Sequence, residues 1–532
     1  MGTGHMTTAQ NLPVVVIGAG PVGLAAAAHL AERGLEPLVI EAGDGAGAAV
    51  AQWGHVRLFS PWRYDVDAAA RRLLTSAGAG RTEPWSDPEP DTLPTGTELV
   101  EQYLVPLADA LVNGAGAQIR YRTRVLAVTK DGADRSRSLG RERLPYLVRL
   151  ATGPADGSGG TGTVEEIRAQ AVIDASGTYG RPNPLGTSGL PTLGEPESAR
   201  FLAGALPDVL GRDRDRFAGR HTLVVGMGHS AANTLLSLVE LAEQEAAQGA
   251  PVSRITWAIR GGSPRRLYGG GTGDDLPARG LLGTRLRDAV EAGRIELLTR
   301  VAIDRLEPST DPAGDTVRVL GSARRDGDDG ALDLTVHHIA AATGFRPDLA
   351  MLREVRLDLD PVVEAPRRIA PLIDPNLHSC GTVPAHGEAE LTHPDAGFYL
   401  VGMKSYGRAP TFLLATGYEQ VRSIAAALAG DRAAADAVEL NLPETGVCSS
   451  DLALAADADG RVSPDELAAS GAGSCCAVPA APQQVSIGAP PARANPLGGA
   501  PADAASAASA ASAASAGPVG FSTGVMHGRS GD

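Results

Sequence analysis

The feature that most constrains the fold is a short apolar run followed by spaced glycines, and it occurs twice in this 532-residue chain. The first copy is VVVIGAGPVGLAAAAHL, Val14–Leu30, and the second is HTLVVGMGHSAAN, His221–Asn233. In each copy a buried strand is expected to turn sharply into a helix of small residues. Two such units predict an α/β protein with two parallel sheets.

The first copy has the three parts of a βαβ unit. A strand is predicted over Val14–Ile17, a helix over Pro21–Arg33 and a second strand over Pro37–Ile40. The second strand ends in Glu41. This order is typical of a Rossmann-like unit that binds a dinucleotide.

The spacing of the first three glycines explains why a dinucleotide suits this turn. Gly18 permits the tight turn, Gly20 lets a pyrophosphate approach the backbone, and Gly23 lets the helix pack closely on the strand. The free N–H groups and the dipole of the helix N-terminus favour an anion there. Glu41 is placed to accept hydrogen bonds from ribose hydroxyls, so the unit predicts an FAD or NAD site.

The second copy repeats the turn with one change. Gly226 and Gly228 match the first two glycines, Ser230 opens the helix, and Ala231 replaces the third glycine. We interpret this copy as a second dinucleotide site. Two sites of this kind in one chain predict two cofactors that exchange a hydride.

The acid that follows the first unit has no counterpart in the second. The strand Ile255–Ile259 leads to Arg260, and Arg265 and Arg266 follow. A guanidinium binds a 2′-phosphate through paired hydrogen bonds, so these residues favour NADPH over NADH. In the alternative interpretation, the arginines only solvate a loop.

A cluster of aromatic residues lies in QWGHVRLFSPWRYD, in a chain that is otherwise poor in them. Such a cluster in a loop indicates a flat ligand. We predict that Trp53, Arg57 and Trp62 border the flavin, with Arg57 near its pyrophosphate or ring edge. The alternative is that the two tryptophans pack in the core.

Three later glycines are also predicted to approach the cofactors. Gly177 in IDASG and Gly344 in AATGF lie at strand ends where the chain crosses between domains, and Gly402 begins the loop GMKSYGRAP.

A helix predicted from Thr411 to Leu428 follows that loop. Its N-terminus is expected to face the flavin edge on which negative charge develops during reduction. Lys404 and Arg408 precede it and, with Arg57, are the candidates for catalytic residues; the alternative is that these loop cations are solvated.

The order of the motifs resembles that of the two-dinucleotide-domain flavoproteins, and specifically the flavin-containing monooxygenase-like group. The resemblance covers about residues 13–430 and is carried by GAGPVGLAAA, IDASGTYGRPNP, VVGMGHSAAN, ATGFRPD and GFYLVGMKSYGRAPTFLLATGYEQVRSI. Two longer stretches, WGHVRLFSPWRYDVDAAARRLL and LPDVLGRDRDRFAGRHTLVVGMGHSAAN, are similar to a bacterial subgroup of which some members are encoded beside arsenic-resistance genes.

The resemblance implies a domain order and a reaction. An NADPH domain is inserted into an FAD domain, and NADPH reduces FAD. In such enzymes the reduced flavin forms a C4a-hydroperoxide with molecular oxygen and transfers one oxygen atom to a soft sulfur, nitrogen or metalloid atom of a small substrate. The implied domains are 11–219 and 341–432 for FAD and 220–340 for NADPH, between a tag or disordered segment at 1–10 and a Cys-containing, Ala/Ser/Pro-rich disordered tail at 433–532.

Two alternative functions stay open on the sequence. One is an NADPH-dependent flavin reductase with a disulfide, quinone, metal or metalloid acceptor, because FLAGALPDVLG stands where such monooxygenases carry an FxGxxxHxxx(W/Y) signature. A dithiol reductase is disfavoured, since the chain has neither a CxxC nor a CxxxxC pair in either nucleotide domain. The other alternative is a nucleotide-binding redox sensor.

Composition limits the partners. The formal charge is −15, so nucleic acid and anionic membranes are not expected to bind. No stretch approaches 18 consecutive apolar residues, and we expect a cytoplasmic protein, with a homo-oligomer possible. No resident metal is predicted. The tail thiols Cys448, Cys475 and Cys476 are a hypothetical site for a thiophilic ion such as As(III), or else idle reduced thiols.

Overall fold

The computed structural model describes residues 12–78, 84–153, 162–268, 277–309, 315–325, 327–374, 383, 385–409 and 412–440. These residues belong to one compact unit, which spans 1–470. Thr411 and the tail cysteines Cys448, Cys475 and Cys476 lie outside the described residues. Within the described part, no helix has the length and apolar character needed to cross a bilayer.

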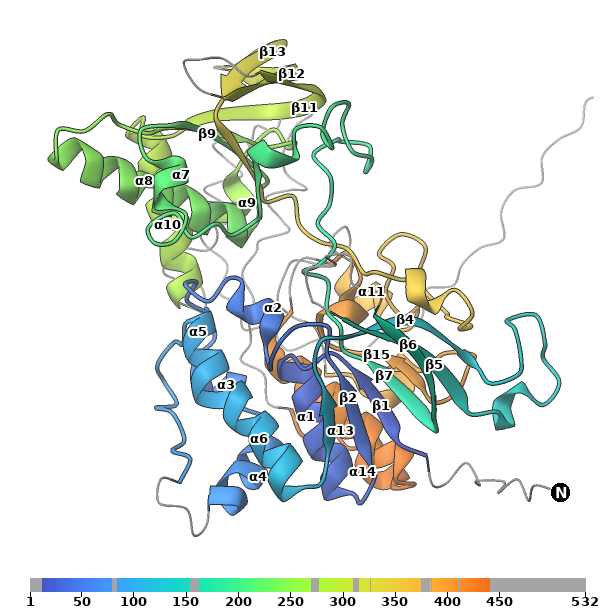
Figure 1. Ribbon diagram of the computed structural model, residues 1–532. Helices are drawn as coiled ribbons and strands as arrows, with labels where there is room; N and C mark the ends of the chain where they lie inside the picture. The colour runs from blue at the N-terminus through green and yellow to red at the C-terminus, as the bar shows by residue number, and fades with distance from the viewer. Residues whose placement is uncertain are drawn as a thin grey trace, which may run out of the picture. The chain divides into compact units, whose positions relative to one another are not determined.

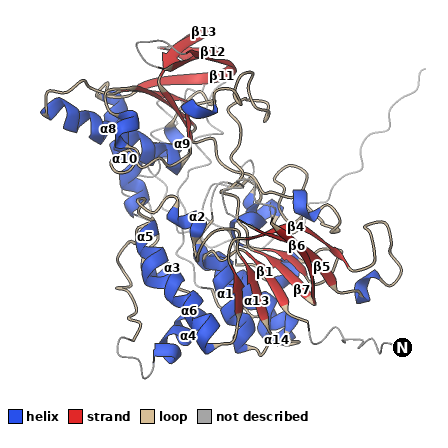
Figure 2. Cartoon of the chain, viewed as in Figure 1, coloured by secondary structure: helices blue, strands red, loops and turns tan. Residues whose placement is uncertain are grey.

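The first glycine unit forms a five-stranded parallel sheet (Figures 1 and 2). Its strand order is β15-β7-β1-β2-β3. The bounds are β1 Val14–Ile17, β2 Pro37–Ile40, β3 Gln118–Arg120, β7 Ala171–Asp174 and β15 Phe398–Leu400. Strand β15 of this sheet follows the whole second unit in the sequence. The second unit is therefore an insertion in the first.

Both faces of this sheet are buried. Val14 and Val16 pack with the helical layer, whereas Val15 and Ile17 pack on a three-stranded antiparallel sheet, β4-β5-β6. Successive side chains of a strand point to opposite faces, so a strand covered on both sides needs an unbroken apolar run. The layers are α1 Pro21–Glu32, α4 Ala68–Gly78, α6 Val105–Gly114 and α13 Leu414–Leu428 on one face, and β4 Thr123–Lys130, β5 Tyr146–Thr152 and β6 Thr163–Ala169 on the other.

The second glycine unit forms a seven-stranded sheet of order β13-β12-β11-β10-β9-β14-β8. Strands β8, β14, β9, β10 and the start of β11 are parallel, and β11, β12 and β13 form an antiparallel meander. The bounds are β8 Leu202–Ala203, β9 His221–Val225, β10 Arg254–Ala258, β11 Glu296–Ser309, β12 Thr316–Arg325, β13 Asp328–Val336 and β14 His338–Ala341. Strand β8 thus belongs to this sheet although it precedes residue 220, where the second domain is predicted to begin.

The second sheet is layered in the same way as the first. Val224 and the fully buried Trp257 pack with α8 His229–Ala247 and α10 Pro277–Glu291. Leu223 and Val225 face the other way and pack with the apolar side of the meander. The two α/β units predicted from the sequence are therefore confirmed.

Two segments of the first unit are interrupted. Residues 96–114 do not form one helix but α5 Gly96–Leu99, a π-helical turn at Val100–Leu104, and α6, because Pro106 has no N–H to continue the hydrogen bonds. Residues 118–130 are divided between two sheets at Arg122, whose φ is +50°.

The remaining helices are short. They are α2 Ala48–Ala51, α3 Trp62–Asp65, α7 Arg214–Phe217, α9 Arg265–Tyr268, α11 Ala370–Ile373, α12 Glu388–Leu391 and α14 Arg432–Asp436. Helix α14 lies where the sequence predicts the start of the tail. The Asp431 side chain caps it by accepting a hydrogen bond from Ala434 N, at 3.0 Å.

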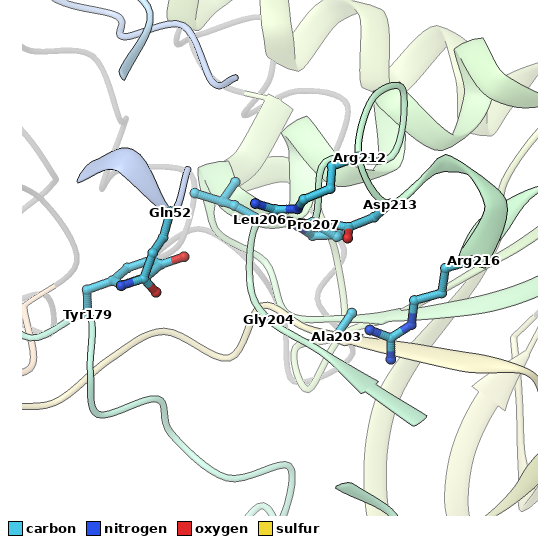
Figure 3. A pocket seen from close by; sticks show the side chains of 9 residues that line it. All are labelled: Gln52, Tyr179, Ala203, Gly204, Leu206, Pro207, Arg212, Asp213 and Arg216. Carbon is cyan, nitrogen blue, oxygen red and sulfur yellow. Dashed lines mark ion pairs between the residues drawn. The ribbon is translucent and has the colours of Figure 1, made fainter. Parts of the chain in front are cut away.

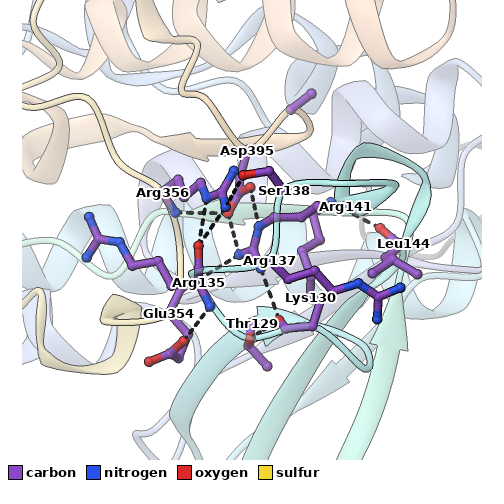
Figure 4. Close-up of polar contacts among 12 residues, drawn as sticks. Thr129, Lys130, Arg135, Arg137, Ser138, Arg141, Leu144, Glu354, Arg356 and Asp395 are labelled. Carbon is purple, nitrogen blue, oxygen red and sulfur yellow. Dashed lines mark hydrogen bonds and ion pairs between the residues drawn. The ribbon is translucent and has the colours of Figure 1, made fainter. Parts of the chain in front are cut away.

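A buried polar cluster anchors the loop between β4 and β5 (Figure 4). The Arg141 guanidinium is almost fully buried and forms a paired contact with Asp395, with both N–O distances at 2.8 Å. Lys130 donates to Leu144 O and lies 3.5 Å from the centroid of the Tyr146 ring. Burial lowers the pKa of Lys130 to about 8. These contacts hold the arginine-rich loop between β4 and β5 in place.

Buried histidines of the second sheet predict an acid-sensitive fold. Burial lowers the pKa values of His221 and His338 to about 4 in the folded state, from a usual 6.5. The unfolded chain then binds more protons, so their contribution to stability is complete above pH 6.5 and is lost as pH falls toward 4. We expect the free energy of unfolding in urea to decline over this window, and to decline less in a His221→Gln/His338→Gln variant. The same change at exposed His55 should leave the slope unaltered; an unchanged slope in the double variant would contradict the assignment.

Candidate functional site

The first glycine turn has the shape that a pyrophosphate needs. Gly18 has a φ of +103°, and a Cβ there would lie 2.8 Å from Ala175 O. A Cβ on Gly23 would lie 2.0 Å from Gly18 O, so α1 approaches β1 at backbone distance. A Cβ on Gly20, the N-cap residue of α1, would meet nothing within 4 Å. No protein contact explains that glycine, whereas a pyrophosphate on the helix N-terminus does.

The second turn repeats this geometry. Gly226 has a φ of +135°, and its Cβ would lie 2.0 Å from Ala342 O. Gly228 is the N-cap residue of α8, and a Cβ added there would again meet nothing within 4 Å. Ser230 lies in the first turn of α8, and Ala231 is fully buried at the third glycine position. The site fits a second pyrophosphate by the same test.

Glu41 lies at the end of β2 with its carboxylate oriented by backbone amides. Oε2 accepts from Ala19 N at 2.7 Å, and Oε1 accepts from Gly43 N at 2.6 Å. Each oxygen keeps a lone pair for a ribose hydroxyl. The contact with Ala19 also ties the Glu41 carboxylate to the glycine turn.

The residues of the aromatic loop differ in burial, so some fit the core-packing alternative and others do not. Trp62 is 4% exposed and belongs to the core of the first unit, as the packing alternative has it. Trp53 is half-buried, and a Cβ added to Gly96 would lie 3.0 Å from its ring. The Arg57 guanidinium donates to Leu93 O and pairs with Glu98 at 3.7 Å. These contacts tie Arg57 to the segment 93–98.

Lys404 is not a solvated loop cation. Its side chain is fully buried, and Nζ lies 2.6 Å from Asp174 Oδ2 and 3.0 Å from Ser176 Oγ. Asp174 ends β7, so the pair joins the end of that strand to the loop after β15. Sequence reasoning missed Asp174; the available signal was an acid that closes the otherwise apolar AVID strand.

The loop and helix that follow Lys404 are fixed by polar contacts. Gly402 has a φ of +64° and donates its N–H to Gln420 Oε1 at 2.8 Å. Arg408 is partly exposed and pairs with Glu364 at 2.7 Å. Helix α13 begins at Leu414, and its cap, Leu413, offers no side-chain hydrogen bond. The helix N-terminus therefore has backbone donors that no capping side chain occupies.

The two crossovers between the units lie side by side. Gly177 and Gly344 both have positive φ, at +67° and +84°. Asn183 N donates to Gly344 O at 2.9 Å, and Asn183 Nδ2 donates to Thr343 O at 3.2 Å. Tyr179 stacks near Phe345, with ring centroids 5.2 Å apart. The chain thus leaves and re-enters the first unit through one hydrogen-bonded pair of segments.

The cations after β10 remain available. Arg260 and Arg265 are exposed, and neither has a carboxylate partner among the residues that the structure describes. The side chain of Arg266 lies outside the described part.

A cavity of about 200 Å³ lies at the end of β8 (Figure 3). Gln52 from the first unit, Tyr179 from the crossover, and Gly204, Arg212 and Arg216 from the second unit line it. Burial raises the pKa of Tyr179, and the nearby Arg212 charge opposes this. The amide, phenol and guanidinium groups that line the cavity suit a small polar molecule.

Asp65 is a buried acid that the sequence did not reveal. Its side chain is fully buried, Oδ1 accepts from Ser60 Oγ at 2.7 Å, and Oδ2 has no partner. Burial raises the pKa of Asp65 to about 7. No cluster of metal-ligating side chains occurs in the described part.

Comparisons with known proteins agree with this geometry. Residues 13–97 match the family described as FAD dependent oxidoreductase. Among curated proteins none matches the chain. A bacillithiol disulfide reductase from Bacillus cereus is similar in fold, with 19% identity, 79% of this chain and 99% of that chain covered, and a TM-score of 0.52. An FAD-bound cadaverine monooxygenase of desferrioxamine biosynthesis from Erwinia amylovora is similar too, with 14% identity, 82% and 99% coverage, and a TM-score of 0.52.

Residues 13–97 therefore match an FAD-dependent oxidoreductase, and FAD is the cofactor that this match supports. The solved structures confirm the two-unit α/β fold. None of these likenesses supports a link with arsenic.

The two open glycine positions predict separable binding defects. In Gly20→Ala the added methyl group meets no protein atom but occupies the pyrophosphate position, so we expect FAD affinity to fall about tenfold or more with little change in Tm. Gly228→Ala should leave the flavin content of the purified protein unchanged and weaken binding of the nicotinamide nucleotide. Flavin absorbance per protein and nucleotide titrations measure both. Equal flavin loss in the two variants would refute the assignment.

The buried Asp174–Lys404 pair predicts a large stability effect. Lys404→Met leaves a buried carboxylate without its cation and should cost about 3–5 kcal/mol in urea unfolding. Asp174→Asn/Lys404→Met removes both charges and should recover much of that loss. If Lys404→Met instead keeps its stability but loses the rate of flavin reduction, Lys404 acts in catalysis rather than in positioning.

Proposed function

We propose that this protein is an NADPH-dependent FAD monooxygenase that oxygenates a small substrate at a soft sulfur, nitrogen or metalloid atom. The observation that carries the proposal is the pair of glycine turns, each with open space at its second glycine, in one compact unit. One dinucleotide site is enough to hold a flavin. A second site of the same shape supports a second nucleotide that supplies hydride to it.

Each turn has a distinct role in the proposal. Gly20 and the N-terminus of α1 bind the FAD pyrophosphate, and Glu41 binds its ribose. Gly228 and the N-terminus of α8 bind the pyrophosphate of NADPH, with Arg260 beside its 2′-phosphate. When bound, FAD would accept one hydride, and with it two electrons, from NADPH and would supply these electrons to oxygen.

The cavity at the end of β8 is the proposed substrate site. It receives Gln52 from the first unit and Gly204 from the second, so it adjoins residues of both. Strand β8 runs parallel to β14, which runs parallel to β9, so the end of β8 lies at the same sheet edge as Gly226. Gln52 and Tyr179 offer hydrogen bonds that orient a small polar substrate.

The distribution of thiols favours oxygen over a disulfide as the acceptor. The first cysteine of the chain is Cys380, so no thiol is present along either glycine unit from 1 to 379. Dithiol exchange needs a pair of thiols beside the flavin. The fold is shared by a disulfide reductase and a monooxygenase, so the fold alone favours neither.

Oxygen stoichiometry tests the proposal on the FAD-loaded full chain. With a thioether, a tertiary amine and arsenite as probes, a monooxygenase consumes one NADPH and one O₂ per oxygenated product, with water as the second product. We expect such coupling with at least one probe. Substrate-independent NADPH oxidation that yields only hydrogen peroxide, together with anaerobic reduction of a quinone or disulfide, would establish the reductase instead.

A further inference from the structure

Arg300 has a backbone conformation that side chains rarely adopt. Its φ is +49°, one of three positive values at non-glycine residues within the described ranges. The conformation is held from both sides, because Arg300 N donates to Gly261 O at 3.0 Å and Val301 N donates to Ile259 O at 2.9 Å. Strained backbone of this kind persists where its surroundings impose it, and it gathers at functional sites.

Arg300 lies at the sheet edge where the second nucleotide is proposed to bind. Leu298 of β11 pairs with Ala258 of β10 in parallel, and Arg300 follows two residues later. Gly226 N donates to Ala258 O at 3.1 Å, so the glycine turn and Arg300 adjoin the same strand end. In open α/β sheets, ligands bind at this carboxyl edge.

The first unit contains the same arrangement. Arg122, with a φ of +50°, donates its N–H to Gly43 O at 2.8 Å, and Thr123 N donates to Glu41 O at 2.9 Å. Arg122 thus corresponds to Arg300, and Gly43 corresponds to Gly261. Because Glu41 is the proposed ribose ligand of the first nucleotide, the correspondence locates Arg300 at the adenosine end of the second.

The Arg300 side chain extends over the loop that carries Arg260. A Cβ added to Gly262 would lie 3.7 Å from Arg300 Nε, and the Arg300 side chain is half-buried. A pair of glycines leaves this space open. The side chain of Arg300 therefore lies beside Gly262, which stands between Arg260 and Arg265 in the loop after β10.

These three arginines have no ion-pair partner among the residues that the structure describes. In the described ranges, no carboxylate lies within ion-pair distance of Arg260, Arg265 or Arg300. At the opposite end of the same strands, Arg254 pairs with Glu296 at 3.0 Å. Uncompensated guanidinium groups around one loop suit a dianion, which they bind through charge-assisted hydrogen bonds.

We propose that Arg300 is a specificity-determining residue that, with Arg260 and Arg265, binds the 2′-phosphate of NADPH. This inference rests on the proposed second nucleotide site. The left-handed backbone of Arg300 directs its side chain to the loop after β10 instead of along the sheet.

Calorimetric titration of the FAD-loaded full chain with 2′,5′-ADP, 5′-AMP and inorganic phosphate tests the inference. The variant is Arg300→Gly, since glycine adopts a φ of +49° without strain and should keep or raise Tm. We expect the Kd of 2′,5′-ADP to rise about tenfold or more, and that of 5′-AMP to change less than twofold.

Arg122→Gly is the matched control, because it removes the corresponding arginine from the first unit. It should leave 2′,5′-ADP binding unchanged. Wild-type affinity for 2′,5′-ADP in Arg300→Gly, or an equal loss of 5′-AMP binding, would overturn the inference while leaving the second nucleotide site intact. A wild-type chain that binds 2′,5′-ADP no better than 5′-AMP would overturn the proposed NADPH dependence itself. If only inorganic phosphate binds, and Arg300→Gly binds it as tightly as the wild type, the loop is a general anion site. That result would also overturn the inference about Arg300.

Discussion

Close backbone packing at each glycine turn is the constraint on which the site depends. A side chain at Gly23 would collide with the backbone of Gly18, and one at Gly226 would collide with Ala342. This contact directs the N-termini of α1 and α8 to the carboxyl edges of their sheets. The backbone donors of both helices are therefore exposed where an anion can reach them. The pyrophosphate contacts inferred for both cofactors are made at those two helix ends.

The two units agree in more than their glycine spacing. In each, the strand after the helix is followed by a loop whose glycine carbonyl accepts from a left-handed arginine, Gly43 from Arg122 and Gly261 from Arg300. What differs is the charge beside that loop. Glu41 supplies a carboxylate in the first unit, whereas Arg260 supplies a cation in the second. The same backbone geometry can thus serve two nucleotides whose adenosine ends carry different charges.

Contacts between distant segments decide which of the candidate side chains are already engaged in structural contacts. Lys404 and Asp174 are separated by 230 residues, yet they form a buried ion pair, so the lysine is committed to holding two strand ends together. Trp62 is committed to the core in a comparable way. Asp65, by contrast, has one carboxylate oxygen, Oδ2, without a hydrogen-bond partner in the described part.

The sequence by itself determined the two α/β units, their strands and the glycines that shape the turns. Those features depend on short-range sterics and on apolar periodicity, both of which are written in neighbouring residues. Only the tertiary structure decided that Lys404 is buried, that the strand after β2 breaks at Arg122, and that Arg300 adjoins the loop of Arg260. Each of these depends on pairing between segments far apart in the chain, and residue type and spacing carry no signal of which distant partner a side chain will meet.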